Sequence, residues 1–335
     1  MGNNIEIYEV NEFKNKILGD YSEGLIAVSD LDSLGNRSTV YFIDKNGTTK
    51  LETPYYDANT KFTDGLAPVA NTNKGLIRYG FIDKKGNVVI DFKYDHARSF
   101  SDGLAAVRHD RKYSFIKEYG NRITPFIFDE VRDFSDGLAA VRCGDKWSYI
   151  DEKGNELFEY KFDDAKDSNL GLIPVKKGSK YGFIDKKGNK IIEFVYEDAE
   201  SFSKEINLAP VKRDGKWGFI NEKGEIVINF IYNGARSFSN GYAAVCEDSK
   251  CGYINRKGQK VIDFIYDGTG DFNDEIALVC TSDVISIGLN DNNTYKFINK
   301  DGIAISRFLT ASELEKNKPC EVINNYKKEK ILNIK

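Results

Sequence analysis

The stretch that most constrains the fold is one that occurs twice. The nine residues FSDGLAAVR occupy positions 100–108 and recur unchanged at 134–142, a shift of 34 residues. Looser copies, such as FTDGLAPV and EIALV, continue the series in both directions, and each closes on a valine. These valines are Val28, Val69, Val107, Val141, Val175, Val211, Val245 and Val279. Eight units with a basal period of 34 residues predict a repeat protein.

Each unit opens with the same two strands. The Gly-Leu-Ala-Ala-Val segment is apolar on both alternating faces, which predicts a strand that is covered on both sides. An aromatic strand follows, as in YGFID at Tyr79 and WGFIN at Trp217, where two large rings at i and i+2 point to one face. We therefore expect Trp217 and Phe219 to be buried together.

A turn and a third strand complete the unit. The turn opens with Asp or Asn and closes with glycine, as in DKKG and NEKG, which indicates a hairpin. The third strand alternates, with Ile90, Phe92 and Tyr94 on one face. The pattern Tyr-Asp-x-Ala-x-x-Phe, from Tyr94 to Phe100, predicts a short fourth strand that leads into the next unit.

These units resemble the bacterial WG containing repeat (KWG) family, whose pattern is roughly G-L-A-x-V, then K-W-G-F-I-D-x-x-G, then V-I and Y-D. The resemblance covers about residues 24–309. Only Trp217-Gly218 keeps the pair that names the family, and the family's proline after the third strand survives only as Pro54 and Pro125. The resemblance implies a repeat architecture and a binding role, with no reaction attached to the repeat itself.

We expect an all-β repeat protein of eight antiparallel units, arranged as a propeller-like ring or, alternatively, as an open β superhelix. Residues 1–23 form a cap, residues 24–309 one domain, and residues 310–335 a tail with a short helix in this interpretation. The Trp position lies six residues after the closing valine in units three to seven, but twelve, ten and sixteen residues after it in units one, two and eight. A ring would bring these three long loops together, whereas an open array would place them at opposite ends as divergent caps. The ring is the preferred prediction.

Composition excludes several classes of function. A formal net charge of −4 argues against nonspecific nucleic-acid binding, which depends on clustered Lys and Arg. No apolar run approaches the roughly 18 residues of a membrane span, and the first residues do not resemble a signal peptide. Five cysteines without metal-ligand spacing predict reduced thiols in a cytoplasmic protein, although Cys246 and Cys251 flank a short hairpin and could pair under oxidation. We expect a monomer.

The residues that carry most enzyme chemistry have structural interpretations in this chain. Its two histidines, His96 and His109, are expected on the surface. Carboxylates recur at two turn positions, which marks them as turn formers rather than catalytic acids. They are Asp83, Asp151 and Asp185 at one position, and Asp64, Asp102 and Asp136 at the other. No P-loop, dinucleotide fingerprint or calcium loop is present, so no catalytic residue, cofactor or metal is predicted.

Two classes of function remain: a non-catalytic interaction module that presents loops to a protein, peptide or glycan, and a hydrolase with its site at a propeller mouth. We prefer the first, because rigid scaffolds carry function on loops and the length variation is confined to one loop position. The candidate binding residues are polar side chains of the three long loops. They are Asp30, Asp32, Arg37, Asn71, Asn73, Arg78, Asp283, Asn290, Asp291 and Asn292. With many hydrogen-bonding groups and little apolar surface, they predict a polar partner of modest affinity.

Overall fold

A computed structural model represents the whole chain. It describes residues 16–17, 22–31, 37–43, 48–56, 61–73, 75–272, 276–282, 293–303 and 309–310. More than half of these residues lie in β-strands, and none of them lies in a helix. Within this part of the chain, therefore, no helix has the length and apolar character needed to cross a membrane. The predicted C-terminal helix lies outside the described residues.

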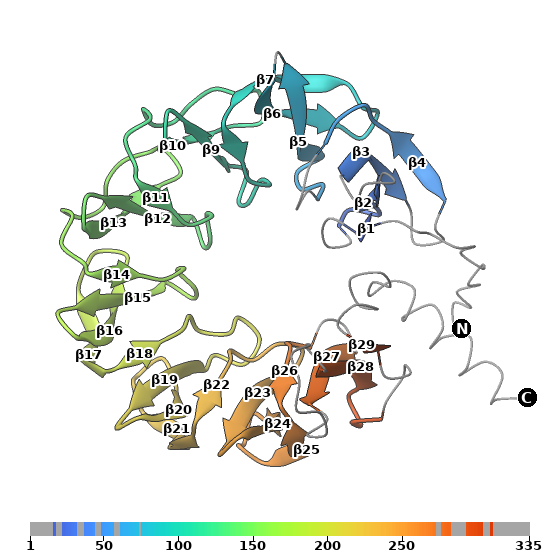
Figure 1. Cartoon of the computed structure of the whole chain (residues 1–335). Helices are drawn as coiled ribbons and strands as arrows, with labels where there is room; N and C mark the ends of the chain where they lie inside the picture. Colours follow the sequence, from blue (N-terminus) through green and yellow to red (C-terminus); the bar gives the residue numbers. More distant parts are fainter. Residues whose placement is uncertain are drawn as a thin grey trace, which may run out of the picture. The chain divides into compact units, whose positions relative to one another are not determined.

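The chain divides into two compact units, residues 1–160 and 161–335, and each is described by itself. The described residues of the first unit form four antiparallel sheets in chain order (Figure 1). They are sheet one, with β1 (Lys16–Ile17), β2 (Ile26–Leu31), β3 (Arg37–Ile43) and β4 (Thr49–Glu52); sheet two, with β5 (Leu66–Asn73), β6 (Leu76–Asp83) and β7 (Val88–Tyr94); sheet three, with β8 (His96–Ala97), β9 (Ala105–His109) and β10 (Lys112–Ile116); and sheet four, with β11 (Glu130–Val131), β12 (Leu138–Cys143) and β13 (Lys146–Asp151).

The described residues of the second unit form four further sheets, each with four strands. They are sheet five, with β14 (Asp164–Ala165), β15 (Leu172–Lys177), β16 (Lys180–Asp185) and β17 (Lys190–Tyr196); sheet six, with β18 (Asp198–Ala199), β19 (Ala209–Arg213), β20 (Lys216–Ile220) and β21 (Ile226–Tyr232); sheet seven, with β22 (Gly234–Ala235), β23 (Tyr242–Glu247), β24 (Lys250–Asn255) and β25 (Lys260–Tyr266); and sheet eight, with β26 (Gly268–Thr269), β27 (Ile276–Ser282), β28 (Asn293–Asn299) and β29 (Leu309–Thr310). The predicted all-β architecture of eight antiparallel repeats is confirmed, while closure into a ring stays a prediction.

The strand patterns behave as the sequence predicts. The Leu-Ala-Ala-Val segment of β12 is buried along its whole length, as its two apolar faces predict. The third strand β7 buries Ile90 and Tyr94 and exposes the residues between them, apart from the half-buried Phe92. The turn that precedes it closes on Gly86, whose φ of 84° is the left-handed conformation that glycine adopts without strain.

The hydrophobic core lies between consecutive sheets. In the second unit, Phe219 and Tyr232 of sheet six pack against Phe238 and Val245 of sheet seven. One pair of aromatic rings recurs at such junctions, with centroids about 5 Å apart. The pairs are Phe81–Phe100 at 5.1 Å, Phe115–Phe134 at 4.8 Å, Phe183–Phe202 at 5.1 Å and Phe219–Phe238 at 5.0 Å. Neighbouring sheets within each unit thus stabilise one another, as in other repeat proteins.

The prediction that Trp217 and Phe219 are buried together is wrong in part. Phe219 is fully buried, whereas Trp217 is only half-buried and packs at the margin of the same cluster. Trp217 faces Lys212, one residue pair from the hairpin turn. The equivalent Trp147 of sheet four is buried and has two arginine side chains over its ring, so the place on the strand does not by itself decide the burial of this residue.

Candidate binding site

A recurrent side-chain oxygen, from Asp or Asn, joins neighbouring sheets within each unit, and we call this arrangement the clasp. Asp129 lies between sheets three and four, where its Oδ1 accepts a hydrogen bond from Lys112 Nζ at 2.6 Å. Its Oδ2 accepts the backbone N–H of Gly144, in the following hairpin turn, at 2.9 Å. In the second unit Asn233 takes the same place, with its Oδ1 accepting from Lys216 Nζ at 3.1 Å and from the Asp248 N–H at 2.9 Å. The residue after the aromatic ring of this pattern, Asp129 after Phe128 and Asn233 after Tyr232, therefore has a structural role.

The clasp makes stability depend on pH. The hydrogen bond from Lys112, followed by that from Gly144, holds the pKa of Asp129 below its ordinary value. A carboxylate with a lowered folded-state pKa contributes stability above its unfolded pKa of about 4, and this contribution is lost as pH falls through the folded value. We expect Asp129→Asn, which keeps the acceptor but removes the charge, to lower the free energy of unfolding by about 1 kcal/mol at pH 7.

Urea unfolding at pH 7 and near pH 3 measures this effect. The difference between wild type and Asp129→Asn should shrink at low pH, whereas Asp129→Ala should remain destabilised because the Gly144 N–H loses its acceptor. An Asp129→Asn penalty that is the same at both pH values would contradict the role of the charge.

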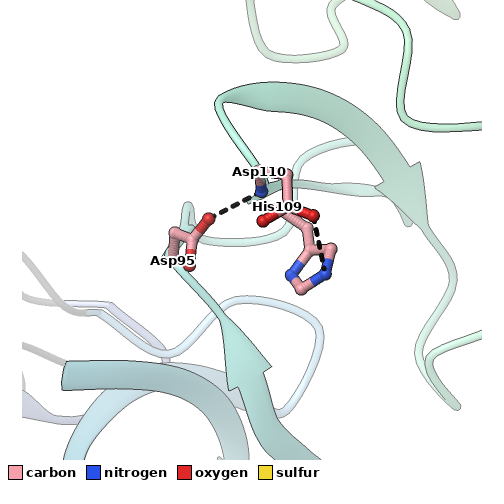
Figure 2. A group of neighbouring side chains, drawn as sticks. All are labelled: Asp95, His109 and Asp110. Carbon is pink, nitrogen blue, oxygen red and sulfur yellow. Dashed lines mark hydrogen bonds and ion pairs between the residues drawn. The ribbon is translucent and has the colours of Figure 1, made fainter. Parts of the chain in front are cut away.

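The group Asp95, His109 and Asp110 has the composition of a metal site, since one ligand atom from each lies within 4.8 Å of the others (Figure 2). Its geometry is nevertheless that of a clasp. Asp95 forms an ion pair with Arg78 and accepts the Asp110 N–H at 2.8 Å. His109 Nε2 lies 3.5 Å from the Asp110 carboxylate, and its side chain is half exposed. We therefore interpret Asp95, His109 and Asp110 as a structural cluster rather than a metal site.

The carboxylates at the two turn positions also have structural partners. Asp83 Oδ1 accepts the backbone N–H groups of Lys85 and Asn87, which closes the turn before the third strand. Asp64 and Asp102 have positive φ values of 53° and 50°, and each accepts the N–H of a glycine in the next repeat. The interpretation of these residues as turn formers is confirmed at the described positions. His96, expected on the surface, is instead half-buried, and this burial lowers its pKa, with a further contribution from Arg108 and Arg98.

A pocket of about 260 Å³ opens between sheets three and four of the first unit. It is lined by Arg98, Tyr113, Glu130, Val131, Arg132 and Trp147. Arg98 and Arg132 occupy the same repeat position, immediately after the short strands β8 and β11, while the two rings come from β10 and β13. The repeat thus places equivalent cations on the two neighbouring sheets that line the pocket.

Arginine side chains dominate the electrostatics of this pocket. The Arg132 guanidinium lies 5.7 Å from the centroid of the Trp147 ring, and Arg142 lies over the same ring at 6.0 Å. Glu130 bonds Arg142 at 2.5 Å, a hydrogen bond that raises the Arg142 pKa. Arg98 contacts Asp133 at 3.3 Å, and both of these side chains are more than one-third exposed. Sequence reasoning missed this pocket; the available signal was the recurrence of Arg98 at Arg132, one period later.

Comparison with known proteins identifies the repeat. The family model described as "WG containing repeat" matches six consecutive segments: 79–113, 114–147, 147–181, 181–217, 217–251 and 252–283. The chain belongs to the WG containing repeat family. The resemblance seen in the sequence is therefore confirmed, with the pocket residues from 98 to 147 inside the matched WG repeats.

Solved structures are similar to these WG repeats in fold. One, titled "Crystal structure of the eukaryotic initiation factor", aligns with a TM-score of 0.60 at 13% identity over 86% of both chains. Another, Hsv2p of Kluyveromyces lactis, aligns with a TM-score of 0.44 at 13% identity over 73% of this chain and 93% of its own. At such identity the first likeness bears on the fold alone. No curated protein matches the chain significantly in sequence.

The glycine of the WG pair has a steric role. A Cβ at Gly218 would lie 2.7 Å from the Ile228 carbonyl oxygen, because the third strand bulges toward the aromatic strand. Sheets three and four carry Ser114 and Ser148 at this position, and their hydroxyls bond the carbonyl oxygens of Thr124 and Phe158 at 2.6 Å. There the expected third strand is reduced to isolated bridges, so the prediction of a third strand in every unit is wrong for these two repeats.

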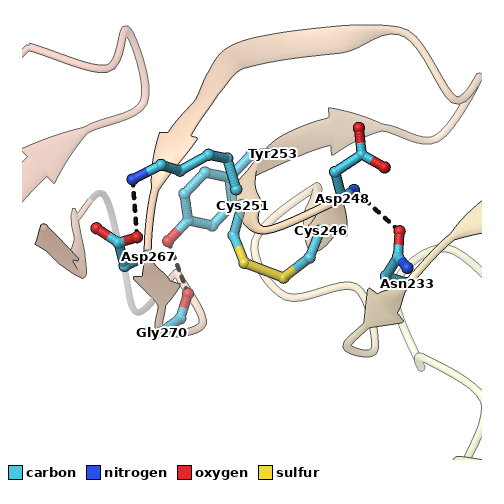
Figure 3. Close-up of a disulfide and its surroundings, with 8 residues drawn as sticks. Asn233, Cys246, Asp248, Cys251, Tyr253, Asp267 and Gly270 are labelled. Atoms are coloured by element: carbon cyan, nitrogen blue, oxygen red, sulfur yellow. Dashed lines mark hydrogen bonds and ion pairs between the residues drawn. A yellow bond between two sulfur atoms is a disulfide. The ribbon is translucent and has the colours of Figure 1, made fainter. Parts of the chain in front are cut away.

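A cross-strand pair of a cation and an aromatic ring recurs in the WG repeats. Arg108 lies over Tyr113 at 5.7 Å and Lys176 over Tyr181 at 5.5 Å. In sheet seven the same two positions are Cys246 and Cys251, which form a disulfide (Figure 3). The expectation of reduced thiols is wrong for this pair, because the register of β23 and β24 places the two residues directly opposite each other.

The disulfide should contribute only modestly to stability. It closes a loop with a sequence separation of 5, for which the chain-entropy relation gives about 2 kcal/mol. The hairpin is also held without it, by Lys250–Asp267 at 2.7 Å and by the Tyr253 hydroxyl, which donates to the Gly270 carbonyl at 2.8 Å (Figure 3). We expect the Cys246→Ser/Cys251→Ser variant to lose at most about 2 kcal/mol.

Unfolding of protein purified without reductant measures this loss, with Cys143→Ser as the control. Mass spectrometry after alkylation should show Cys246 and Cys251 protected and Cys143 modified. Complete alkylation of Cys246 and Cys251 before reduction would contradict the pairing.

The structure places some of the predicted loop residues. Asn71 and Arg78 face each other on β5 and β6, so the insertion of the second repeat lengthens a hairpin rather than forming an irregular loop. Arg78 is engaged with Asp95 in a clasp. Asp30 lies on β2 and Arg37 begins β3, opposite Leu31, while Asn73 ends β5. The remaining five lie outside the described residues: Asp32, Asp283, Asn290, Asp291 and Asn292. Their gathering into one patch stays a prediction.

Proposed function

We propose that this chain is a non-catalytic binding protein whose WG repeats hold a binding pocket rigidly for a protein, peptide or glycan partner. One observation carries the proposal: the pocket between sheets three and four combines two arginines with the rings of Tyr113 and Trp147. Arginine and aromatic residues are enriched in binding hot spots, because they combine large contact area with directed hydrogen bonds. The recurrent carboxylates, by contrast, are occupied in turns and clasps.

The test is to present the full chain to peptide and glycan arrays and, in parallel, to chromogenic ester, glycoside and phosphate substrates. The proposal expects saturable binding to one array class and no turnover of any substrate. Turnover that is saturable and purifies with the chain would favour the alternative function, a hydrolase. Absence of binding on both arrays would overturn the proposal.

We further propose that the eight repeats close into a propeller-like ring of a single monomeric chain. In support, the three longest insertions of the sequence would then be neighbours, and loops on one face of a propeller commonly act together. Small-angle scattering tests the proposal, since an open superhelix has a larger maximum dimension than a ring of the same length. A cytoplasmic location stays a prediction, and the disulfide, a bond favoured by oxidising compartments, argues for testing it by fractionation.

A further inference from the structure

The size of the pocket between sheets three and four limits what it can hold. Its volume of about 260 Å³ lies below the roughly 300–1,000 Å³ of pockets that enclose whole small molecules or cofactors. A site of this size suits one or two side chains of a partner rather than a complete ligand. The first constraint is therefore that the pocket receives an anchoring side chain.

The burial of Trp147 favours a peptide over a glycan as the ligand. Its side chain is only 7% exposed, and Arg132 and Arg142 both lie over the ring. A sugar that stacks on tryptophan needs an open ring face, which this residue does not present. Trp147 and Val131 still line the pocket, so the short aliphatic stem of an incoming side chain meets apolar atoms there without stacking on a ring face.

The pocket has two cations, Arg98 and Arg132, and both already have interaction partners that an incoming anion would have to displace. Glu130 is neutralised by its contact with Arg142 at 2.5 Å. The Arg98–Asp133 pair, 3.3 Å long with side chains 37% and 51% exposed, belongs to the class of exposed ion pairs that contribute about 0–1 kcal/mol. An incoming carboxylate can therefore compete for Arg98 at low cost. Guanidinium groups also match carboxylate geometry better than ammonium groups do.

We propose that the pocket binds an acidic side chain of a peptide segment, with the carboxylate between Arg98 and Arg132 and the aliphatic stem against Trp147. This inference rests on the proposed binding function and names its ligand class. A phosphorylated side chain offers the same anionic chemistry, and the test distinguishes the two sources.

The experiment uses a fluorescently labelled peptide library whose central residue is fixed in turn as Glu, Asp, phosphoserine, Gln or Lys, titrated into the full chain by fluorescence polarisation. We expect the Glu and Asp sets to bind about tenfold or more tighter than the Gln set, and their affinity to fall as salt rises. Arg98→Gln/Arg132→Gln should weaken the acidic sets by about tenfold to a hundredfold.

Arg236→Gln is the matched control. Arg236 occupies the same repeat position and makes the same ion pair, with Asp271 at 3.3 Å, but it does not line the pocket. It should leave binding unchanged, and circular dichroism of all variants should be that of the wild type.

Each alternative outcome is distinct. Preference for phosphoserine over both Glu and Asp would replace the carboxylate by a phosphate as the ligand. Binding of the Gln or Lys sets, or of glycans only, that is equal in wild type and double variant would overturn the acidic peptide while leaving the binding function standing. Equal loss in Arg236→Gln would overturn the pocket as the site. Binding to no set and to no glycan would overturn both.

Discussion

Replacing Phe219 with alanine should lower the free energy of unfolding by about 3–5 kcal/mol, the usual loss for a large ring removed from a core. Phe219 is completely buried, and its ring lies 5.0 Å from that of Phe238 in the next sheet. The substitution therefore empties a junction between two sheets rather than a site within one of them. Urea unfolding followed by fluorescence measures the loss.

Trp217→Ala is the matched comparison, because Trp217 lies two residues earlier on the same strand and is larger but only half-buried. Trp217→Ala should lower the free energy of unfolding by roughly 1–3 kcal/mol, less than Phe219→Ala does, because a smaller part of the Trp217 side chain is buried. Hydrogen exchange of Phe219→Ala should increase in sheets six and seven together. A larger loss for Trp217→Ala, or faster exchange in sheet six alone, would contradict this account of the junction.

Most of the fold is predictable from the sequence because each recurring type of side chain within the repeat has one structural role. The doubly apolar Leu-Ala-Ala-Val segment can be satisfied only between two neighbours, and the glycine after the turn has the positive φ that the hairpin requires. Because each pattern occurs in up to eight copies, every copy is separate support for the same predicted strand or turn. Their agreement explains why strands and turns were predictable.

Features that depend on contacts between repeats were less accessible. The clasp joins Lys112, Asp129 and Gly144, which belong to three different segments of the chain. No local sequence pattern predicts hydrogen bonds between such distant residues. The loss of the third strand in sheets three and four was not predictable either, because Ser114 and Ser148 bond the carbonyl oxygens of Thr124 and Phe158 through their side chains, which the alternation of apolar residues does not indicate. The disulfide needed the strand register, since the spacing of Cys246 and Cys251 is also compatible with two free thiols.

The pocket was not predicted from the sequence, for a related reason. Differences in loop length point to residues that depart from the repeat, such as residues 281–294. Arg98 and Arg132 instead occupy a regular repeat position and do not stand out in this way. They become a site only where two consecutive repeats both carry arginine and the following aromatic strand carries Trp147. A comparison of repeats position by position, with attention to charge, is the sequence procedure suited to such sites.

The name-giving glycine is expected to be nearly irreplaceable wherever the third strand bulges. At Gly252 an added Cβ would lie 2.4 Å from Phe264 Cδ1, 2.5 Å from the Ile262 carbonyl oxygen and 2.6 Å from that of Asp263. Two of these neighbours are backbone atoms, which cannot rotate away. We therefore expect Gly252→Ala to cost about 3 kcal/mol, at the upper end of the usual range for overpacking.

Gly234→Ala, in the same sheet, is the control. An added Cβ there would approach no atom closer than 3.6 Å, and Gly234 does not have a positive φ. Alanine at such a position should leave stability unchanged or raise it slightly, because the unfolded chain loses freedom. Thermal and urea unfolding of both variants decide the matter. If Gly252→Ala is as stable as Gly234→Ala, the close approach of the third strand does not explain the glycine of the WG pair, and the bulge must be able to relax away from the aromatic strand.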